Sequence, residues 1–133
     1  DEKQEIKNVC SLIRRSLNEI EFIATGICRN QSELAKLSDT ESNNLYKQYL
    51  EHSIKSAEEE LSKEYNGLEL YCGDAMLIIE PKKHLLISLN DIYELSSEII
   101  NRKRIVSEYS KLFTLIKKYQ NAYEKLLREI DKV

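Results

Sequence analysis

The chain has 133 residues, of which 41% are hydrophobic and 32% are charged. This is the length of one ordinary domain, and it suffices to bury a core without disulfides or metal ions. Only three Gly and one Pro are present, and this scarcity of helix-breaking residues favours α-helix throughout the chain. Because no run of about eighteen uninterrupted apolar residues occurs, we expect no transmembrane helix.

The chain begins with DEKQEIKN, without an initiator Met and without the pattern of a signal peptide. We therefore expect residues 1–133 to form a single helical domain that is a fragment of a longer protein. The three cysteines, Cys10, Cys28 and Cys72, form no CxxC pair, and their odd number argues against a disulfide framework. We interpret them as small buried side chains in a reducing compartment, the cytoplasm or the nucleus.

The first segment has apolar residues at alternating spacings of three and four, which is typical of an amphipathic helix. These positions are Ile6, Cys10, Ile13, Leu17, Ile20, Ala24 and Ile27, followed by polar Gln31 and by Leu34. The spacing predicts a helix over residues 3–36 that packs its apolar stripe against a partner helix. We expect Gln31 at a core position of this stripe, where it would cost stability and fix the register.

The polar segment KLSDTESNN at residues 36–44 interrupts the pattern. Within it, Ser38 to Glu41 matches a capping box, with Ser38 as the N-cap of the next helix. A second apolar stripe then includes Leu50, Ile54, Ala57, Leu61, Tyr65, Leu68, Cys72, Ala75 and Ile79. Gly67 and Gly73 weaken this stripe, so YNGLELYCGD is the expected break. We predict helices over residues 39–66 and 68–80, the second of them open to continuity with either neighbour.

Pro81 is the only proline of the chain. It lacks a backbone donor and is expected to push Glu80 away from helical geometry. Two readings remain open, and we favour the first, in which Pro81 lies in the first turn of a new helix. In the second, Pro81 kinks one continuous helix. The apolar run AMLIIE before it has no second strand to pair with, so helix is expected there too.

The last segment is predicted to be one helix over residues 82–131. Its stripe contains Leu85, Leu89, Ile92, Leu95 and Ile99, then Ile105, Tyr109, Leu112, Ile116, Tyr119, Tyr123, Leu126 and Ile130. The slip at NRKR, residues 101–104, is interpreted as a local adjustment of register. As a continuous helix, residues 83–131 would form a rod of roughly 70 Å.

These segments predict an all-α fold, an elongated antiparallel helical bundle or coiled coil of three to four helices. The predicted core contains Ile13, Leu17, Ile20, Leu61, Leu68, Ile79, Leu89, Ile92, Ile99, Leu112, Ile116 and Leu126.

The sequence offers little for catalysis. His52 and His84 belong to no HxxxH or ExxH metal pair, and no Gly-rich phosphate loop or GxSxG motif occurs. Glu94 and Glu98 lack the ExxH partners of metal sites in helical bundles. The eight tyrosines are interpreted as the edge of the core, without the basic groove that nucleic-acid stacking needs. We expect no enzyme, no cofactor, no metal and no nucleic acid.

Charge divides the chain. Residues 1–80 contain nine Lys and Arg and sixteen Asp and Glu, a net charge of −7, whereas residues 81–133 carry +4. The candidate contact residues in this basic part are Arg102, Lys103, Arg104, Lys117 and Lys118. They form either a solvated helix face that complements the acidic half of the bundle, or a surface for an acidic partner or anionic lipid.

Three stretches resemble the BAR domains of sorting nexins: LNEIEFIATGICRNQSELAKLSDTES, LNDIYELSSEIINRKRIVSEYSKL and KKYQNAYEKLLREI. The resemblance covers about residues 10–130 and rests on degenerate heptads. It implies long kinked helices that dimerise into a curved module, with the five basic residues named above as candidate lipid contacts. The sequence departs from the family in being too short for three full helices and in its negative net charge.

The broader hypothesis is a non-catalytic scaffold module of a larger tethering, trafficking or cytoskeletal assembly. Its apolar helix stripes would bind a protein partner or a second copy of the chain. The alternative is a BAR-like dimer in the cytoplasm, peripheral to membranes. Only the alternative predicts salt-sensitive sedimentation with anionic liposomes.

Overall fold

The computed structural model describes residues 1–102 and 108–133, and within these ranges it contains helices and no strand. The α-helices are α1 (Glu2–Lys36), α2 (Glu41–Ile79), α3 (Ile87–Asn101) and α4 (Tyr109–Glu129). Two short 3₁₀ helices are η1 (Glu80–Lys82) and η3 (Ile130–Lys132). The predicted all-α fold is confirmed. No helix in the described part of the chain is both long enough and apolar enough to cross a lipid bilayer.

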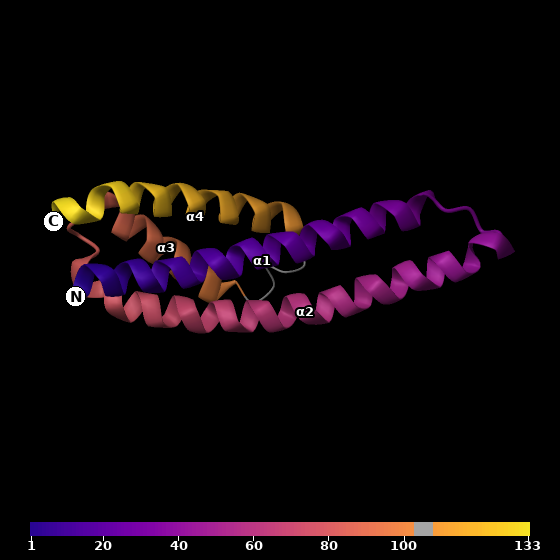
Figure 1. The fold of residues 1–133 in the computed structure, drawn as a ribbon, viewed down its shortest axis with the longest axis horizontal. Helices are drawn as coiled ribbons and strands as arrows, with labels where there is room; N and C mark the ends of the chain where they lie inside the picture. Colours follow the sequence, from indigo (N-terminus) through magenta and orange to yellow (C-terminus); the bar gives the residue numbers. More distant parts are fainter. Residues whose placement is uncertain (103–107) are drawn as a thin grey trace.

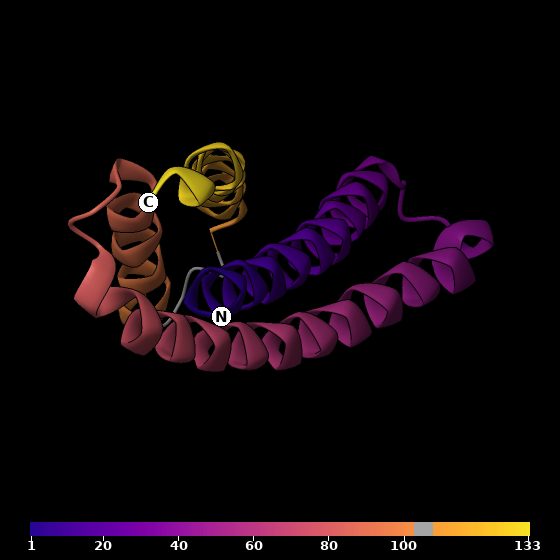
Figure 2. The same ribbon diagram turned by 60° about the vertical axis from the view of Figure 1, so that its left-hand side comes forward.

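The helices form an elongated antiparallel bundle (Figure 1). α1 and α2 make a long hairpin, α3 packs against α2, and α4 packs against both α3 and α1. α3 and α4 cover only the end of the hairpin that carries the two chain termini, as Figures 1 and 2 show. We call residues 28–49, at the far end of the hairpin, the arm, and the remaining described residues the body.

All twelve residues of the predicted core are at most 2% exposed. They belong to one continuous cluster that lies in the body and receives side chains from all four α-helices. Gln31 is exposed, so the prediction that it occupies a core position is wrong. The reason is its place in the arm, where neither α3 nor α4 lies over the hairpin.

α2 is continuous from Glu41 to Ile79, so the break expected in YNGLELYCGD is absent. The helical cost of about 1 kcal/mol for each of Gly67 and Gly73 is offset locally, because Leu68 and Cys72 are fully buried between them. The prediction of Ser38 as N-cap is also wrong. The N-cap is Thr40, in extended backbone, and its side chain caps no backbone N–H.

The chain does break near Pro81, as favoured from the sequence. α2 ends at Ile79, Pro81 lies in the first turn of η1, and α3 begins only at Ile87. The new helix that contains Pro81 in its first turn is therefore a single 3₁₀ turn, Glu80–Lys82. Glu80 keeps right-handed helical geometry, with φ −45° and ψ −49°, so its expected displacement from the helical region is wrong.

The predicted 82–131 helix is wrong, because α3 ends at Asn101 and α4 begins at Tyr109. Arg102 leaves helical geometry, with φ −97° and ψ 83°. The Tyr65 hydroxyl from α2 lies 2.6 Å from the carbonyl oxygen of Ile99 and 2.7 Å from that of Arg102. A helix end leaves such carbonyls without intrahelical partners, and the single hydroxyl hydrogen of Tyr65 is donated to one of the two or shared between them. Ile105, a predicted position of the apolar stripe, lies outside the described residues.

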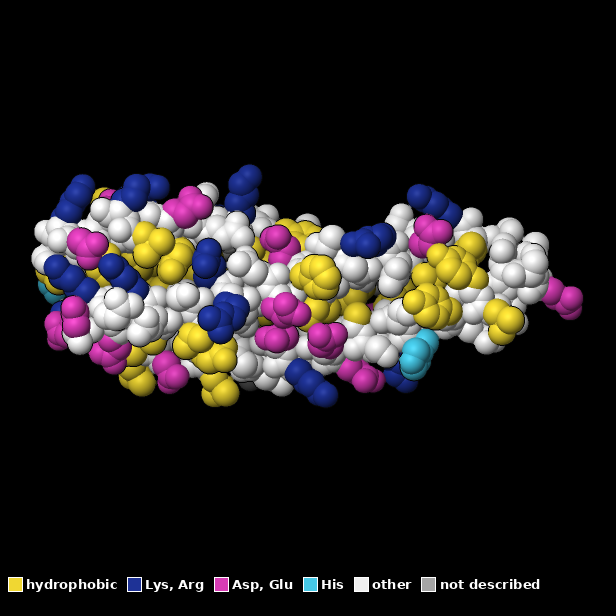
Figure 3. Space-filling model, in the orientation of Figure 1, with side chains coloured by type: hydrophobic (Ala, Val, Ile, Leu, Met, Phe, Trp, Pro, Cys, Tyr) yellow, Lys and Arg dark blue, Asp and Glu magenta, His cyan; other side chains and the backbone are white. Residues whose placement is uncertain are grey.

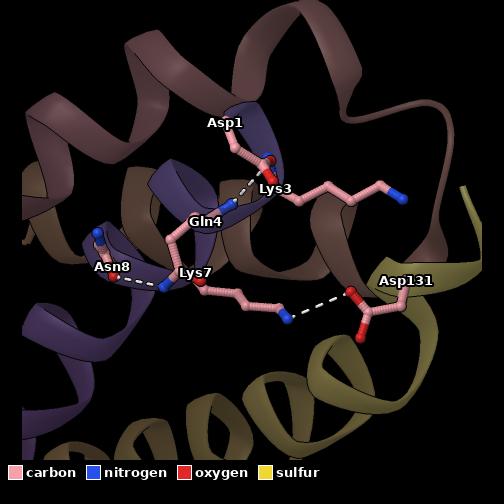
Figure 4. Close-up of polar contacts among 6 residues, drawn as sticks. All are labelled: Asp1, Lys3, Gln4, Lys7, Asn8 and Asp131. Carbon is pink, nitrogen blue, oxygen red and sulfur yellow. Dashed lines mark hydrogen bonds and ion pairs between the residues drawn. The ribbon is translucent and has the colours of Figure 1, made fainter.

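The two ends of the chain meet at one end of the body (Figure 4). The Asp1 carboxylate caps α1 by accepting hydrogen bonds from the backbone N–H of Lys3 at 2.8 Å and of Gln4 at 3.4 Å. Lys7 Nζ lies 3.2 Å from a carboxylate oxygen of Asp131 in η3. This exposed ion pair adds little stability, and it brings η3, directly after α4, beside the first turns of α1.

Candidate functional site: a charged groove between α3 and α4

The seam between α3 and α4 is hollowed on the outside of the body. A depression of about 400 Å³ is lined by Asp91, Glu94, Leu95, Lys118, Asn121, Ala122 and Lys125. A second depression of about 310 Å³ is lined by Glu98, Arg102, Ser110, Lys111, Thr114, Leu115 and Lys118. Both share Lys118, so they form one run along the seam, which we call the α3–α4 groove.

The acidic wall of the groove comes from α3. Asp91, Glu94 and Glu98 follow one another at spacings of three and four, which places them on one face of the helix. Asp91 and Glu94 are exposed, and Glu98 is half-buried.

The basic wall comes from α4, where Lys111, Lys118 and Lys125 recur every seven residues. Seven residues are close to two helical turns, so these three ammonium groups lie along one edge of the helix. The floor between the walls is apolar and consists of Leu95, Leu115 and Ala122, which are 9%, 4% and 6% exposed.

The ion pairs at the groove join residues that are only three or four positions apart in the sequence. Arg102 Nη2 lies 2.9 Å from Glu98, one turn earlier, and Lys111 Nζ lies 2.7 Å from Glu108 at the start of α4. The hydrogen bond from Lys111 lowers the pKa of the Glu108 carboxyl. Among residues 1–102 and 108–133, no ion pair within 4.0 Å joins the acidic wall to the basic wall. The charges of the two walls therefore do not neutralise each other directly across the groove.

An exposed apolar side chain lies next to the acidic wall, at the N-terminal end of α3. Ile87 precedes Asp91 by one turn on the same face of α3, and it is 68% exposed. The next residue, Ser88, is buried and donates a hydrogen bond of 3.2 Å to Glu129 near the end of α4. This bond joins the start of α3 to the end of α4.

The five basic candidates from the sequence do not form one described surface. Arg102 and Lys118 line the α3–α4 groove. Lys117 is exposed on α4 but is not among the lining residues. Lys103 and Arg104 lie outside the described residues. Sequence reasoning missed the acidic wall, although the heptad recurrence of Lys111, Lys118 and Lys125 was a signal that α4 has a basic edge.

The ionisable groups with strongly shifted pKa values lie in the core instead of the groove. Burial raises the pKa of the Cys10 and Cys72 thiols to about 12. Burial also raises the pKa of Tyr119 well above its ordinary value, and its hydroxyl donates a 2.7 Å hydrogen bond to the Cys10 carbonyl. The interpretation of Cys10 and Cys72 as small buried side chains is confirmed, whereas Cys28 is half-buried.

His52 and His84 are exposed. In the part of the chain that the structure describes, no group of three or more His, Cys, Asp or Glu is arranged to hold a metal ion.

The chain matches no protein-family model, no curated protein and no solved structure.

Proposed function

We propose that this chain is a non-catalytic helical scaffold module that binds a partner protein by receiving a partner helix in the α3–α4 groove. The observation that carries the proposal is an apolar floor between two walls of opposite charge that do not pair with each other. Charges that flank an apolar seam are the features by which helices choose helical partners. Glu98 and Lys111 already pair with neighbours on their own helices, so among the described residues the wall charges without an ion pair are those of Asp91, Glu94, Lys118 and Lys125.

The dimensions of the groove favour a helix as the occupant. Its basic wall runs from Lys111 to Lys125, which spans about 21 Å along α4. A partner helix of four turns has the same length, and it would lie against α3 and α4 together as a fifth helix. The apolar seam of such a helix would itself be removed from water against the floor, and its flanking charges would lie against the two walls.

A binding role, as opposed to catalysis, is supported by where the chemically perturbed groups lie. Active sites are places where burial and neighbouring charges shift pKa values inside a cleft. Here the thiols of Cys10 and Cys72 and the hydroxyl of Tyr119 are fully buried in the core, so they present no reactive atom to a substrate.

The proposal is tested by site-specific photo-crosslinking in cells that make this protein naturally. A photoreactive side chain would replace Asn121, which lines the groove, or Glu124, which is exposed on α4 outside it. We expect the position 121 probe to capture a protein that the position 124 probe does not, through a peptide with helical apolar spacing. Capture of the same proteins from both positions would contradict the proposal.

A second candidate is the BAR-like module in contact with anionic membrane, in the cytoplasm. It is supported by the exposure of Lys117, Lys118 and Arg128 on α4 and by the net charge of +4 over residues 81–133. This candidate requires a dimer with a curved envelope, which small-angle X-ray scattering with mass determination would reveal. It also requires salt-sensitive sedimentation with anionic liposomes that Lys117→Glu and Lys118→Glu weaken equally.

A further inference from the structure

The order of charges across the α3–α4 groove specifies more than a general affinity for helices. We propose that the groove accepts an amphipathic helix with basic residues on one flank of its apolar seam and acidic residues on the other, and that these charges set the helix direction. This inference rests on the proposed function, and it adds the chemistry and the orientation of the partner.

The two flanks of the partner follow from the two walls. The partner flank that lies along Asp91, Glu94 and Glu98 is attracted to these carboxylates if it carries Lys or Arg. The other flank lies along the α4 lysines and is attracted to them if it carries Glu or Asp. A helix with two basic flanks would set one of them against Lys118 and Lys125, and a helix with two acidic flanks would set one against the carboxylates. Each such helix is attracted to one wall and repelled by the other.

The floor of the groove indicates where the partner helix should carry a large apolar side chain. Ala122 and Leu95 both line the larger depression, and the short Ala side chain takes up less room than a Leu would at this position. A large apolar side chain fits above Ala122, in the way that a knob enters a hole between facing helices. The exposed Ile87 side chain provides a further apolar contact at the same end of the groove.

The direction of the partner follows from symmetry. If a helix in the groove is turned end to end while its seam still faces the floor, its two flanks exchange walls. A helix with one basic and one acidic flank therefore matches both walls in only one direction. If the two flanks are exchanged in the partner sequence, the matching direction reverses.

The experiment uses four synthetic two-heptad peptides and the full 133-residue chain. Each peptide has Leu at positions a and d and is stapled through its outward face, so that it is helical on its own. Positions e and g carry Lys and Glu, Glu and Lys, Lys and Lys, or Glu and Glu. We expect both mixed peptides to bind about tenfold more tightly than either single-charge peptide at low salt, with the difference shrinking as salt screens the walls.

The direction is read from a nitroxide label at the peptide N-terminus. For one mixed peptide we expect broadening of backbone amide signals around Ile87 and Lys125, and for the flank-exchanged peptide around Glu98 and Lys111. Broadening at the same end for both mixed peptides would overturn the inference.

The matched variants are Lys118→Glu, in the groove, and Lys117→Glu, one residue away and outside it. Both side chains are exposed, so both variants should fold. We expect Lys118→Glu to weaken both mixed peptides severalfold and Lys117→Glu to leave them unchanged.

The remaining outcomes are distinct. Equal binding of all four peptides at the groove would overturn the inference and leave the proposed function standing. Binding of none would overturn both. A dimer of the chain alone that Lys118→Glu dissociates would show that a second copy occupies the groove and would also overturn the inference.

Discussion

The body and the arm are built from the same two helices, yet only the body buries side chains on them. α1 and α2 present buried Ile, Leu, Cys and Ala residues throughout the body, whereas none of residues 28–49 is buried. In the arm, Leu45 and Tyr49 are 79% and 64% exposed, and Tyr49 stacks on Tyr46. Figure 3 shows hydrophobic side chains gathered on this end of the molecule.

The difference shows that an amphipathic stripe becomes core only where a second layer covers it. The stripe of α1 continues past Ile27 to Leu34, but Leu34 is only half-buried. In the arm, α1 and α2 leave every side chain at least partly exposed, and the body gains its fuller enclosure from α3 and α4. We therefore expect backbone amides of the arm to exchange with solvent faster than those of the body.

The largest expected effect comes from the same substitution at two positions of α2. Leu68 is fully buried in the body, and Leu50, 2% exposed, is the first buried residue after the arm. We expect Leu68→Ala to lower the free energy of unfolding by about 3 kcal/mol, because rigid neighbours on several helices leave a cavity. Leu50→Ala should cost roughly half as much, because Leu50 lies outside the continuous core cluster and its surroundings can close more easily around the gap. Urea unfolding of both variants measures the difference, and equal losses would mean that the body is packed as firmly at its border with the arm as at its centre.

The next effect concerns alkaline pH and the two buried thiols of the body. The pKa of Cys10 and Cys72 is about 12 in the folded chain, against an ordinary value of 9.0. Above pH 9 the unfolded chain loses these protons while the folded chain keeps them, so stability falls as pH rises toward 12. Each thiol should contribute a fall of up to about 1.4 kcal/mol per pH unit once the pH exceeds 9.

The measurement is urea unfolding at pH 8, 9 and 10 in the presence of a reductant that prevents oxidation. Cys72→Ala should remove about half of the decrease in the free energy of unfolding between pH 9 and 10. The double variant Cys10→Ala, Cys72→Ala should remove most of that decrease. An unchanged slope in the double variant would show that other groups control alkaline stability.

A smaller effect on stability is expected from removing the Tyr65 hydroxyl, which lies at the C-terminal end of α3. Tyr65→Phe removes the donor near the Ile99 and Arg102 carbonyl oxygens and leaves them without this partner. We expect a loss of about 1–2 kcal/mol in the free energy of unfolding. The control is Tyr49→Phe in the arm, where the side chain is exposed and the loss should be near zero. A thermal melt of each variant suffices, and similar shifts for both would contradict the role assigned to Tyr65.

The sequence predicted the buried layer well because Leu and Ile at helical spacing on every helix leave few alternatives to one shared core. It did not predict the end of α3, since the partner there is Tyr65, more than thirty residues earlier in the chain. The α3–α4 groove was missed for a similar reason. Its acidic and basic walls lie on different helices, and only the packing of α3 beside α4 makes one surface of them.

The smallest expected effect tests how the body is closed at Pro81. The side chain is exposed and lies in the first turn of η1, where a missing backbone N–H costs little. Pro81→Ala should therefore change the free energy of unfolding by less than about 1 kcal/mol, and it should destabilise, because Ala widens the conformational freedom of the unfolded chain. A clear increase in melting temperature would instead mean that Pro81 strains a helix that would otherwise continue. In that case η1 would be a kink imposed on α2, and the start of α3 would be set by the proline and not by packing.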